Sequence, residues 1–473
     1  MEISRRNLFK IAGVGLASVL SNTFISCSLE GASMLQGIKK SAEKLRPQKF
    51  NMCGYAAPKL ETVKIGFIGL GNRGPGAVER MSKIQGVEIT AICDVNPKGL
   101  GIAQNILSKH GLPAAKEYTG SDDAWKGLCE SGDVDLVYTA TPWRLHTPIA
   151  VYAMEHDKHA AVEVPAAVTV DEAWQLVETS ERTRKHCMML ENCCYDFFEL
   201  LVLNMARHGF FGELIHYEGS YIHDLVRSDF SKTAYYDSWR QRENQHRNGN
   251  LYPTHPLGPA CQLLNINRGD KMEYLTSMSS NDFTRAKLAF ELAAKDDYYK
   301  EFATDTYRGN MNVTVIRTNK GKTIQLQHDV SSPRPTTRAF LVSGTNGIAI
   351  KPGRIARGHS FYNREQMSDL EKQYTPEIIK VVGDLAKKIG GHGGMDFMMD
   401  WRLIDCLRNG IPLDQDVYDA ALWSVISPLS EWSVANRSNS IDIPDFSNGA
   451  WKTNLPVDVS LSLGGNTKVK MDS

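Results

Sequence analysis

The chain has 473 residues, and its 54 basic side chains balance 54 acidic ones, so the formal net charge is zero. This length predicts two or three domains, and a hydrophobic fraction of 42% is that of an ordinary globular protein. The balanced charge and the lack of a Lys/Arg-rich run argue against nucleic-acid binding, and no apolar stretch reaches the roughly 20 residues of a membrane-spanning helix.

The first 27 residues predict an export signal. Arg5 and Arg6 precede a short apolar run, Ile11–Leu20, in a pattern that resembles a twin-arginine signal, which exports folded proteins. Phe24-Ile25-Ser26-Cys27 resembles a lipoprotein cleavage box, with Cys27 as the acylated first residue. Ordinary cleavage near Ser26, or retention as a short anchor, are the alternatives. We therefore expect a periplasmic protein, or one that contacts the membrane through a lipid on Cys27.

Eight cysteines remain beyond Cys27, and they contain no C-x-x-C pair. Without such spacing, and without histidines at finger-like intervals, no metal site is expected. A twin-arginine substrate folds in a reducing cytosol before export, so we expect mostly free, buried thiols.

Residues 28–61 show no periodicity and predict a linker. From Val63, strand-like apolar runs alternate with helix-like segments. The expected strands are 63–68, 87–93, 134–139, 159–162 and 188–190, with helices between them. This alternation predicts an α/β fold in which residues 62–187 form a Rossmann-type, doubly wound parallel sheet.

The rhythm changes beyond residue 190. Strand-like runs separated by turn signals are expected at 214–222, 274–279, 312–318, 323–328 and 339–343, and longer helices at 376–388 and 394–408. Asn319-Lys320-Gly321-Lys322 predicts a hairpin turn. Residues 188–455 therefore predict an α+β substrate and oligomerisation domain on a largely antiparallel open sheet, followed by a tail at 456–473.

A glycine loop follows the first strand. Gly69, Gly71 and Gly74 fit G-x-G-x-x-G at the start of a helix, a pattern that lets a pyrophosphate approach the backbone and the helix N-terminus. Asp94 ends the second strand, where its carboxylate can accept from ribose hydroxyls. A 2′-phosphate would lie close to that charge, and Arg73 would offset only part of the repulsion. The sequence therefore predicts NAD rather than NADP.

Further motifs make a resemblance specific. The glycine loop, Asp94, Thr141-Pro142-Trp143-Arg144-Leu145-His146 and Glu163-Val164-Pro165 resemble the Gfo/Idh/MocA oxidoreductase family. Members usually carry Glu-Lys-Pro at the last motif, and that lysine is assigned to moving the substrate's hydroxyl proton. Val164 cannot transfer a proton, which argues against simple alcohol dehydrogenation by the usual arrangement.

The second half resembles one branch of that family, glycoside hydrolase family 109, the NAD-dependent α-N-acetylgalactosaminidases. The motifs that carry this resemblance are Glu191-Asn192-Cys193-Cys194-Tyr195, Gly219-Ser220-Tyr221-Ile222-His223-Asp224, Trp239-Arg240, Leu251-Tyr252-Pro253-Thr254-His255 and His392-Gly393-Gly394-Met395-Asp396. One position departs: Thr336 follows Arg334-Pro335 where the family carries Tyr, which leaves the exact sugar and linkage open.

The resemblance implies two groups of site residues around a tightly bound, recycled NAD. The dinucleotide group, besides the glycines, is Asn72, Arg73, Asp94, Trp143, Arg144, His146, Glu163, Val164 and Asn192. The substrate group is Tyr195, Tyr221, His223, Arg240, Tyr252, Thr254 and His255, of which Tyr195, Tyr252 and His255 are the expected catalytic residues. The order in which these three serve the proton transfers stays open.

The family route implies transient oxidation at C3 of the sugar, loss of the C2 proton with departure of the C1 group, addition of water, and re-reduction. Two other functions compete with this hydrolysis. One is an exported NAD-dependent sugar dehydrogenase or epimerase of the broader family, and the other is a carbohydrate-binding lipoprotein without catalysis. A homo-oligomer, most simply a dimer, is expected because open sheet faces of such second domains often mediate dimers.

Overall fold

The computed structural model describes residues 35–470, so the predicted export signal and Cys27 lie outside the described residues. The N-terminal half is built on a six-stranded parallel sheet in the order β3-β2-β1-β4-β5-β6. Its strands are β1 (Val63–Ile68), β2 (Val87–Cys93), β3 (Lys116–Tyr118), β4 (Leu136–Thr139), β5 (His159–Val162) and β6 (Cys187–Met189). The Rossmann-type prediction is confirmed. Of the strands of this sheet, only β3 was not predicted, because this edge strand is short and largely exposed.

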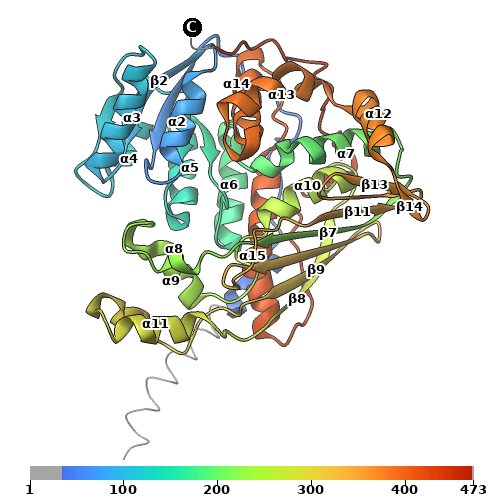
Figure 1. The fold of residues 1–473 in the computed structure, drawn as a ribbon. Helices are drawn as coiled ribbons and strands as arrows, with labels where there is room; N and C mark the ends of the chain where they lie inside the picture. Colours follow the sequence, from blue (N-terminus) through green and yellow to red (C-terminus); the bar gives the residue numbers. More distant parts are fainter. Residues whose placement is uncertain (1–34, 471–473) are drawn as a thin grey trace, which may run out of the picture.

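Helices connect these strands and cover the sheet (Figure 1). They are α2 (Gly74–Ser82), α3 (Pro97–Lys109), α4 (Ala124–Cys129), α5 (His146–Glu155) and α6 (Val170–Thr183), with a 3₁₀ turn at Trp143–Leu145. The start of α6 is fixed locally, because the Thr169 hydroxyl accepts from the Glu172 amide and the Glu172 carboxylate accepts from the Thr169 amide.

The second half carries a nine-stranded sheet in the order β14-β13-β12-β11-β7-β10-β9-β8-β15. Neighbouring strands are antiparallel except β7 and β10, which run parallel. The strands are β7 (Leu214–Ile222), β8 (Met272–Ser279), β9 (Asn312–Thr318), β10 (Thr323–Asp329), β11 (Phe340–Gly344), β12 (Ile348–Ile350), β13 (Arg354–Arg357), β14 (Ser360–Phe361) and β15 (Ile441–Asp442). The predicted turn joins β9 to β10, with Gly321 at a φ of 82°.

Some helices of this half lie between its sheet and the N-terminal half, and others lie beside the sheet at the lower left and upper right of Figure 1. They are α7 (Phe197–Arg207), α8 (Val226–Asp229), α9 (Trp239–His246), α10 (Thr254–Leu264), α11 (Arg285–Ala293), α12 (Arg364–Tyr374), α13 (Glu377–Ile389), α14 (Met395–Asn409) and α15 (Val417–Ala435). Short 3₁₀ turns lie at Asn192–Tyr195, Tyr236–Ser238, Asp297–Phe302, His392–Gly394 and Ala450–Lys452.

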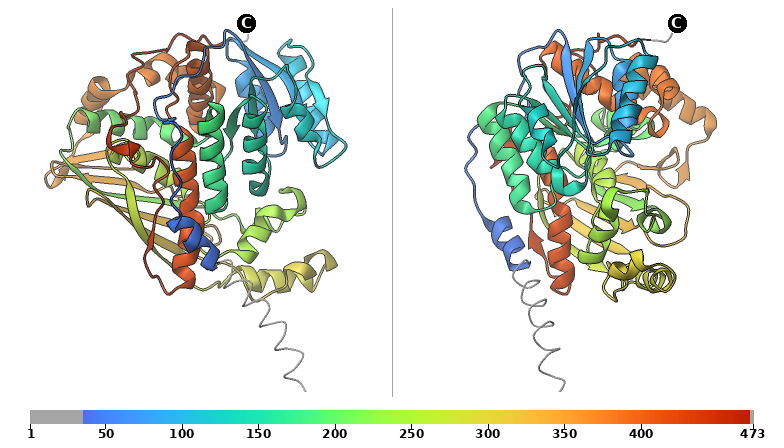
Figure 2. Two further views of the ribbon diagram at one scale, coloured as in Figure 1. Left: turned by 180° about the vertical axis from the view of Figure 1, so that it is seen from behind. Right: turned by 90° about the vertical axis from the view of Figure 1, so that its left-hand side faces the viewer.

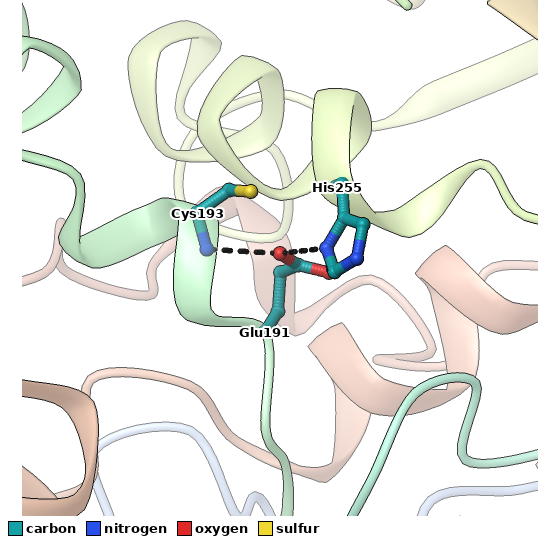
Figure 3. Close-up of side chains that lie close together, drawn as sticks. All are labelled: Glu191, Cys193 and His255. Carbon is teal, nitrogen blue, oxygen red and sulfur yellow. Dashed lines mark hydrogen bonds and ion pairs between the residues drawn. The ribbon is translucent and has the colours of Figure 1, made fainter. Parts of the chain in front are cut away.

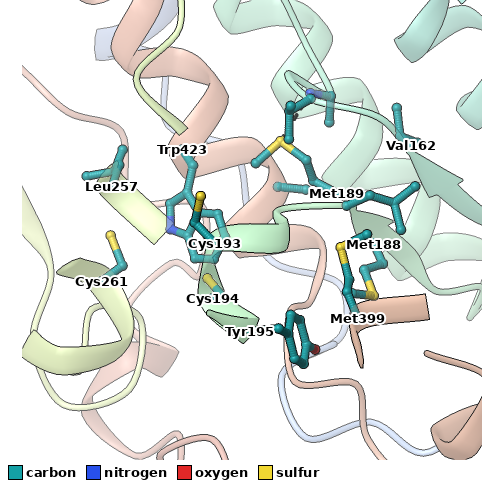
Figure 4. Close-up of a cluster of buried hydrophobic side chains, with 14 of the residues drawn as sticks. Val162, Met188, Met189, Cys193, Cys194, Tyr195, Leu257, Cys261, Met399 and Trp423 are labelled. Atoms are coloured by element: carbon teal, nitrogen blue, oxygen red, sulfur yellow. Dashed lines mark hydrogen bonds between the residues drawn. The ribbon is translucent and has the colours of Figure 1, made fainter. Parts of the chain in front are cut away.

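Two C-terminal helices join the halves. Helix α15 packs against both α6 and β8, and α14 packs against α2. A buried cluster fills the junction behind the end of β6 (Figure 4). It includes Val162, Met188, Met189, Cys193, Cys194, Leu257, Cys261, Met399 and Trp423. The two halves therefore share one core at the carboxyl edge of the parallel sheet.

The segments that we expected to be a linker and a tail both pack on this body. Residues 35–43 are helical and lie beside α15 (Figure 2), where the Lys39 ammonium is 5.6 Å from the Trp432 ring. At the other end, the Trp401 indole donates to the Thr467 carbonyl, and Val469 forms a β-bridge with Ile84. Sequence windows could not show this packing, because the partners lie far away along the chain.

The eight cysteines within residues 35–470 are unpaired, and all but Cys53 are buried. They agree in this respect with the expected free, buried thiols. Among the same residues, no helix has both the length and the apolar character needed to cross a membrane.

Candidate active site

The glycine loop connects β1 to α2, and each glycine has its own steric reason. Gly69 has a φ of 89°, and a Cβ there would lie 2.7 Å from the Ala140 backbone. A Cβ at Gly74 would lie 2.1 Å from the Gly69 oxygen, whereas one at Gly71 would meet nothing within 4 Å. Gly69 and Gly74 thus permit the tight turn. At Gly71 the backbone has open space beside it, and a phosphate can approach the chain there.

Asp94 is held rigidly at the end of β2. Its two oxygens accept from the amides of Leu70, at 2.5 Å, and Asn96, at 2.7 Å. Because Leu70 belongs to the glycine loop, the same carboxylate that would meet the ribose also fixes the loop that would meet the phosphates.

Arg73 does not extend toward Asp94. Its guanidinium pairs with Glu163 at 3.1 Å and with Asp396 at 3.3 Å. Asp396 also accepts from the Asn192 amide at 2.5 Å and lies 2.9 Å from the His392 ring nitrogen. Asp396 lies in the motif His392-Gly393-Gly394-Met395-Asp396, but nothing in the sequence pattern assigns it a role.

The pKa of Asp396 is lowered despite its burial, which acts in the opposite direction. The hydrogen bond from His392 and the charges of Arg73 and Arg80 outweigh the loss of solvation. Asp396 is therefore an ionised hub that connects three of the expected dinucleotide residues: Arg73, Asn192 and, through Arg73, Glu163.

The remaining dinucleotide candidates have different surroundings. His146 is buried, and its two ring nitrogens lie 2.7 Å from the Pro165 carbonyl and 2.8 Å from the Thr141 carbonyl, so it joins two loops. Val164 is also buried, Arg144 is exposed, and the Asn72 amide donates to the Ala234 carbonyl at 2.6 Å. That last bond brings the second half onto the glycine loop.

An aromatic cluster gathers the expected substrate residues. The Tyr252 ring lies 4.8 Å from Tyr221 and 4.9 Å from His255, and the Arg240 guanidinium is 5.2 Å from the Tyr252 ring. Trp143 stacks on Tyr252 at 5.6 Å. Since Trp143 follows a strand of the parallel sheet, the cluster spans both halves of the molecule.

Two predicted substrate residues lie at the margin of this cluster. The His223 ring stacks 6.1 Å from Tyr221, while Thr254 is fully buried at the start of α10. Burial raises the pKa of the Tyr252 hydroxyl, and the charge of Arg240 only partly opposes this effect. The Tyr252 hydroxyl therefore stays protonated at neutral pH.

Tyr195 has contacts of a different kind. Its hydroxyl donates to the Asp414 carboxylate at 3.2 Å, and Asp414 pairs with Arg402 at 3.0 Å. In Figure 4, its ring points away from Cys193 and toward Met399. Burial and the Asp414 charge raise the pKa of its hydroxyl. The structure thus groups Tyr252 and His255, but gives Tyr195 the surroundings of a buried tyrosine bound to an ion pair.

His255, Glu191 and Cys193 lie together (Figure 3). The His255 ring also contacts Tyr221 and Tyr252 of the aromatic cluster. The Nδ1 atom of His255 is 2.7 and 3.0 Å from the two Glu191 oxygens, and the Cys193 amide donates to Glu191 at 3.0 Å. One ligand atom from each residue would fit a metal ion. However, the histidine and carboxylate already bond to each other, and the Cys193 sulfur accepts from Arg338 at 3.3 Å, so the arrangement favours a hydrogen-bonded dyad.

Arg338 is a site residue that the sequence did not reveal. It lies between the Arg334-Pro335 motif and β11, and only its proximity in the fold relates it to Cys193 and Glu191. Burial lowers the pKa of His255, Glu191 opposes that shift, and the charges of Arg338 and Arg73 reinforce it.

Comparisons with known proteins cover nearly all of this architecture. Residues 63–191 match the family model of the oxidoreductase family, NAD-binding Rossmann fold. Residues 195–453, more than half of the chain, match the model of the glycosyl hydrolase 109 C-terminal domain. The boundary between the two matches lies between residues 191 and 195, after β6.

Relatives align over most of their lengths. A glycosyl hydrolase family 109 protein of Bacteroides fragilis is 49% identical over 421 residues, which cover 85% of this chain and 89% of the relative. One from Shewanella pealeana is 46% identical over 469 residues, covering 97% of this chain and 99% of the relative.

Solved structures share the fold at low identity. Levoglucosan dehydrogenase in complex with NADH has a TM-score of 0.61 at 16% identity, covering 81% of this chain and 100% of its own. Lactobacillus casei myo-inositol dehydrogenase, in complex with NAD(H) and myo-inositol, has a TM-score of 0.55 at 16% identity, covering 82% and 99%. At this identity the likeness concerns the fold.

Proposed function

The chain belongs to glycosyl hydrolase family 109, an NAD-dependent enzyme family, and on that premise we propose that it hydrolyses α-linked N-acetylgalactosamine or a related sugar. The observation that carries this proposal is the cluster of Tyr221, Arg240, Tyr252 and His255 around Trp143. It puts proton-transfer groups beside the edge of the NAD-binding domain, where ligands of parallel α/β sheets bind.

The residues at that edge fit NAD. Gly71 leaves the backbone open, Asp94 presents a fixed carboxylate, and Arg73 is held by Glu163 and Asp396 rather than free to receive a 2′-phosphate. Bound NAD⁺ supplies a hydride acceptor that is restored within each turnover, which lets it stay tightly bound.

The substrate chemistry follows from a temporary ketone. When C3 of the sugar is oxidised, the C3 carbon loses a hydride and its hydroxyl loses a proton. The C2 proton then becomes acidic, because the carbanion that its loss leaves is stabilised as an enolate. Loss of that proton breaks the C1–oxygen bond and releases the aglycone. Water then adds hydroxide to C1 and a proton to C2. Finally the C3 carbon regains its hydride and the C3 oxygen regains a proton, so the net change is hydrolysis.

The proton transfers need side chains other than Val164, which is apolar and buried. The protonated Tyr252 hydroxyl is suited to donate to an oxygen of the sugar, and the neutral imidazole of His255 is suited to accept a proton. Arg240 and Tyr221 both contact the Tyr252 ring, and these contacts fix the orientation of that ring. Tyr195 takes no proton-transfer role in this proposal, because its hydroxyl already donates to the Asp414 carboxylate.

In this proposal, the loop before β11 determines which sugar the site accepts. Thr336 is exposed and lies two residues before Arg338, so this loop offers a small hydroxyl where an aromatic one would be expected. We therefore include related α-glycosides in the proposed substrate class.

The test uses purified protein without added NAD, p-nitrophenyl α-N-acetylgalactosaminide and deuterated water. Released nitrophenol together with a sugar that carries deuterium at C2 supports elimination and addition with a resident cofactor. Release without C2 deuterium contradicts the elimination route. If no glycoside in a panel of α- and β-linked N-acetylhexosamines and hexoses is cleaved, the proposed hydrolysis is wrong.

We also propose that Arg5-Arg6 directs export of the folded, NAD-loaded protein and that Cys27 carries the lipid. Cell fractionation with Arg5→Lys/Arg6→Lys and Cys27→Ser variants tests both. The first change should retain the protein in the cytosol, and the second should release it from the membrane fraction.

A dimer through the outer face of the nine-stranded sheet is a further proposal. On that face Met278 and Val315 are exposed, and β9 alternates buried and exposed positions. Sedimentation of the protein and of a Met278→Glu/Val315→Glu variant should give a dimer and a monomer, respectively.

A further inference from the structure

Glu191 is a buried carboxylate that the proposed chemistry has not used. Its side chain is wholly inaccessible to solvent, and it lies between the end of β6 and the 3₁₀ turn Asn192–Tyr195. Burying a carboxylate is costly unless other groups pair with it. The groups that pair with it here are the Cys193 amide and the Nδ1 atom of His255, which lies within 3.0 Å of both carboxylate oxygens.

The fold makes room for this contact. Gly258, one turn along α10 from His255, faces Glu191, and a Cβ there would lie 2.8 Å from the Glu191 Cγ and 2.8 Å from the Cys194 sulfur. Any larger residue at Gly258 would clash with the Glu191 and Cys194 side chains. The backbone of α10 therefore permits a close approach that serves the Glu191–His255 pair.

We propose that Glu191 is a positioning residue that fixes the tautomer of His255 with the proton on Nδ1, so that Nε2 is the proton acceptor in the active site. This role rests on the proposed function of His255. An ionised carboxylate only accepts hydrogen bonds, so Nδ1 must carry the proton in this contact. In Figure 3 the other ring nitrogen points away from Glu191, so the contact with Glu191 does not occupy it.

Charge explains why a carboxylate is needed rather than a neutral acceptor. The groups that face His255 are Glu191, Arg338 and Arg73, with the rings of Tyr221 and Tyr252. Both arginines and burial disfavour an imidazolium, and Glu191 is the carboxylate among these groups. After Nε2 has taken a proton from the substrate or from water, Glu191 holds the resulting imidazolium until the proton is returned.

The test compares Glu191→Gln and Glu191→Asp with a matched control, Glu199→Gln. Glu199 is also a buried glutamate, but it pairs with Lys351, which keeps Asp196 as a second partner. Each NAD-loaded protein is assayed with p-nitrophenyl α-N-acetylgalactosaminide from pH 5 to 9, and its bound NAD is measured to show that it is folded.

For Glu191→Gln we expect kcat to fall by about 10²- to 10³-fold with KM changed less than about threefold. The acid limb of the kcat/KM profile should move to lower pH by about one unit, because loss of the carboxylate makes His255 harder to protonate. Glu191→Asp should fall between wild type and Glu191→Gln, and Glu199→Gln should keep the wild-type profile. A merely structural role would lower activity without moving the acid limb, and that result would overturn the proposal.

A second measurement does not depend on turnover. Imidazole ¹⁵N shifts of protein labelled at histidine, with His255→Asn for assignment, report the tautomer directly. We expect Nδ1–H and an unprotonated Nε2 in wild type, and loss of this preference in Glu191→Gln. Nε2–H in wild type would refute the dyad. If the tautomer is as expected while no glycoside is cleaved, the proposed hydrolysis fails and the dyad stands.

Discussion

Replacing Asp94 by Asn should change which dinucleotide the protein accepts. The carboxylate is fixed beside the glycine loop by the Leu70 and Asn96 amides, and the nearest expected counter-charge, Arg73, is occupied by Glu163 and Asp396. A phosphate charge about 4 Å from Asp94, at an effective dielectric near 20, costs about 4 kcal/mol, or almost a thousandfold in affinity. The variant removes this repulsion, and it weakens NAD by about tenfold through loss of a charged acceptor.

Calorimetric titration of NAD-depleted protein with NAD⁺ and NADP⁺ measures both effects. Wild type should favour NAD⁺ by at least two orders of magnitude, and Asp94→Asn should bring the two dissociation constants to within about tenfold. Glu88→Gln, which removes a charge from an exposed position of the same strand, is the matched control and should leave the ratio unchanged. If Asp94→Asn keeps the wild-type ratio, the electrostatic reasoning is refuted.

Three further changes test the rest of the site. Tyr252→Phe should lower kcat by about 10²-fold or more in the nitrophenol assay, with normal NAD content, because a proton donor is lost; an unchanged kcat would exclude that role. Thr336→Tyr should alter the order of preference in a glycoside panel, and identical profiles would show that this loop does not select the sugar. Asp396→Asn should cost about 3 kcal/mol in urea unfolding, since Arg73 and the buried Arg80 each lose one of two carboxylate partners, Glu163 and Asp400 being the ones that remain. The lowered pKa of Asp396 means that its contribution is complete above about pH 4 and is lost as pH falls below it, so wild type but not the variant should show this acid loss.

The local part of the fold could be predicted because it repeats along the chain. Strands of the parallel sheet are apolar runs between turn signals, and β7 and β9 have the bounds that the sequence predicted. The glycine loop and Asp94 could also be predicted from the sequence, since the whole pattern lies in one turn and at the end of the next strand. By contrast, α15 was not predicted. It is buried nearly all round and contains Pro428, so it has no polar face and no helical periodicity to detect.

The sequence by itself determined the family, the two-part fold and the residue types of the site. Only the tertiary structure decided which of those residues act together. Tyr195 follows Glu191 by four positions, yet the fold turns it to Asp414, whereas Glu191 meets His255, which is 64 residues away. Arg338 and Asp396 likewise reach the site through contacts with residues far away in the sequence, Cys193 and Asn192. Contacts of this kind depend on how β6, α10 and α14 pack, and close packing between distant segments leaves no periodic trace in the chain.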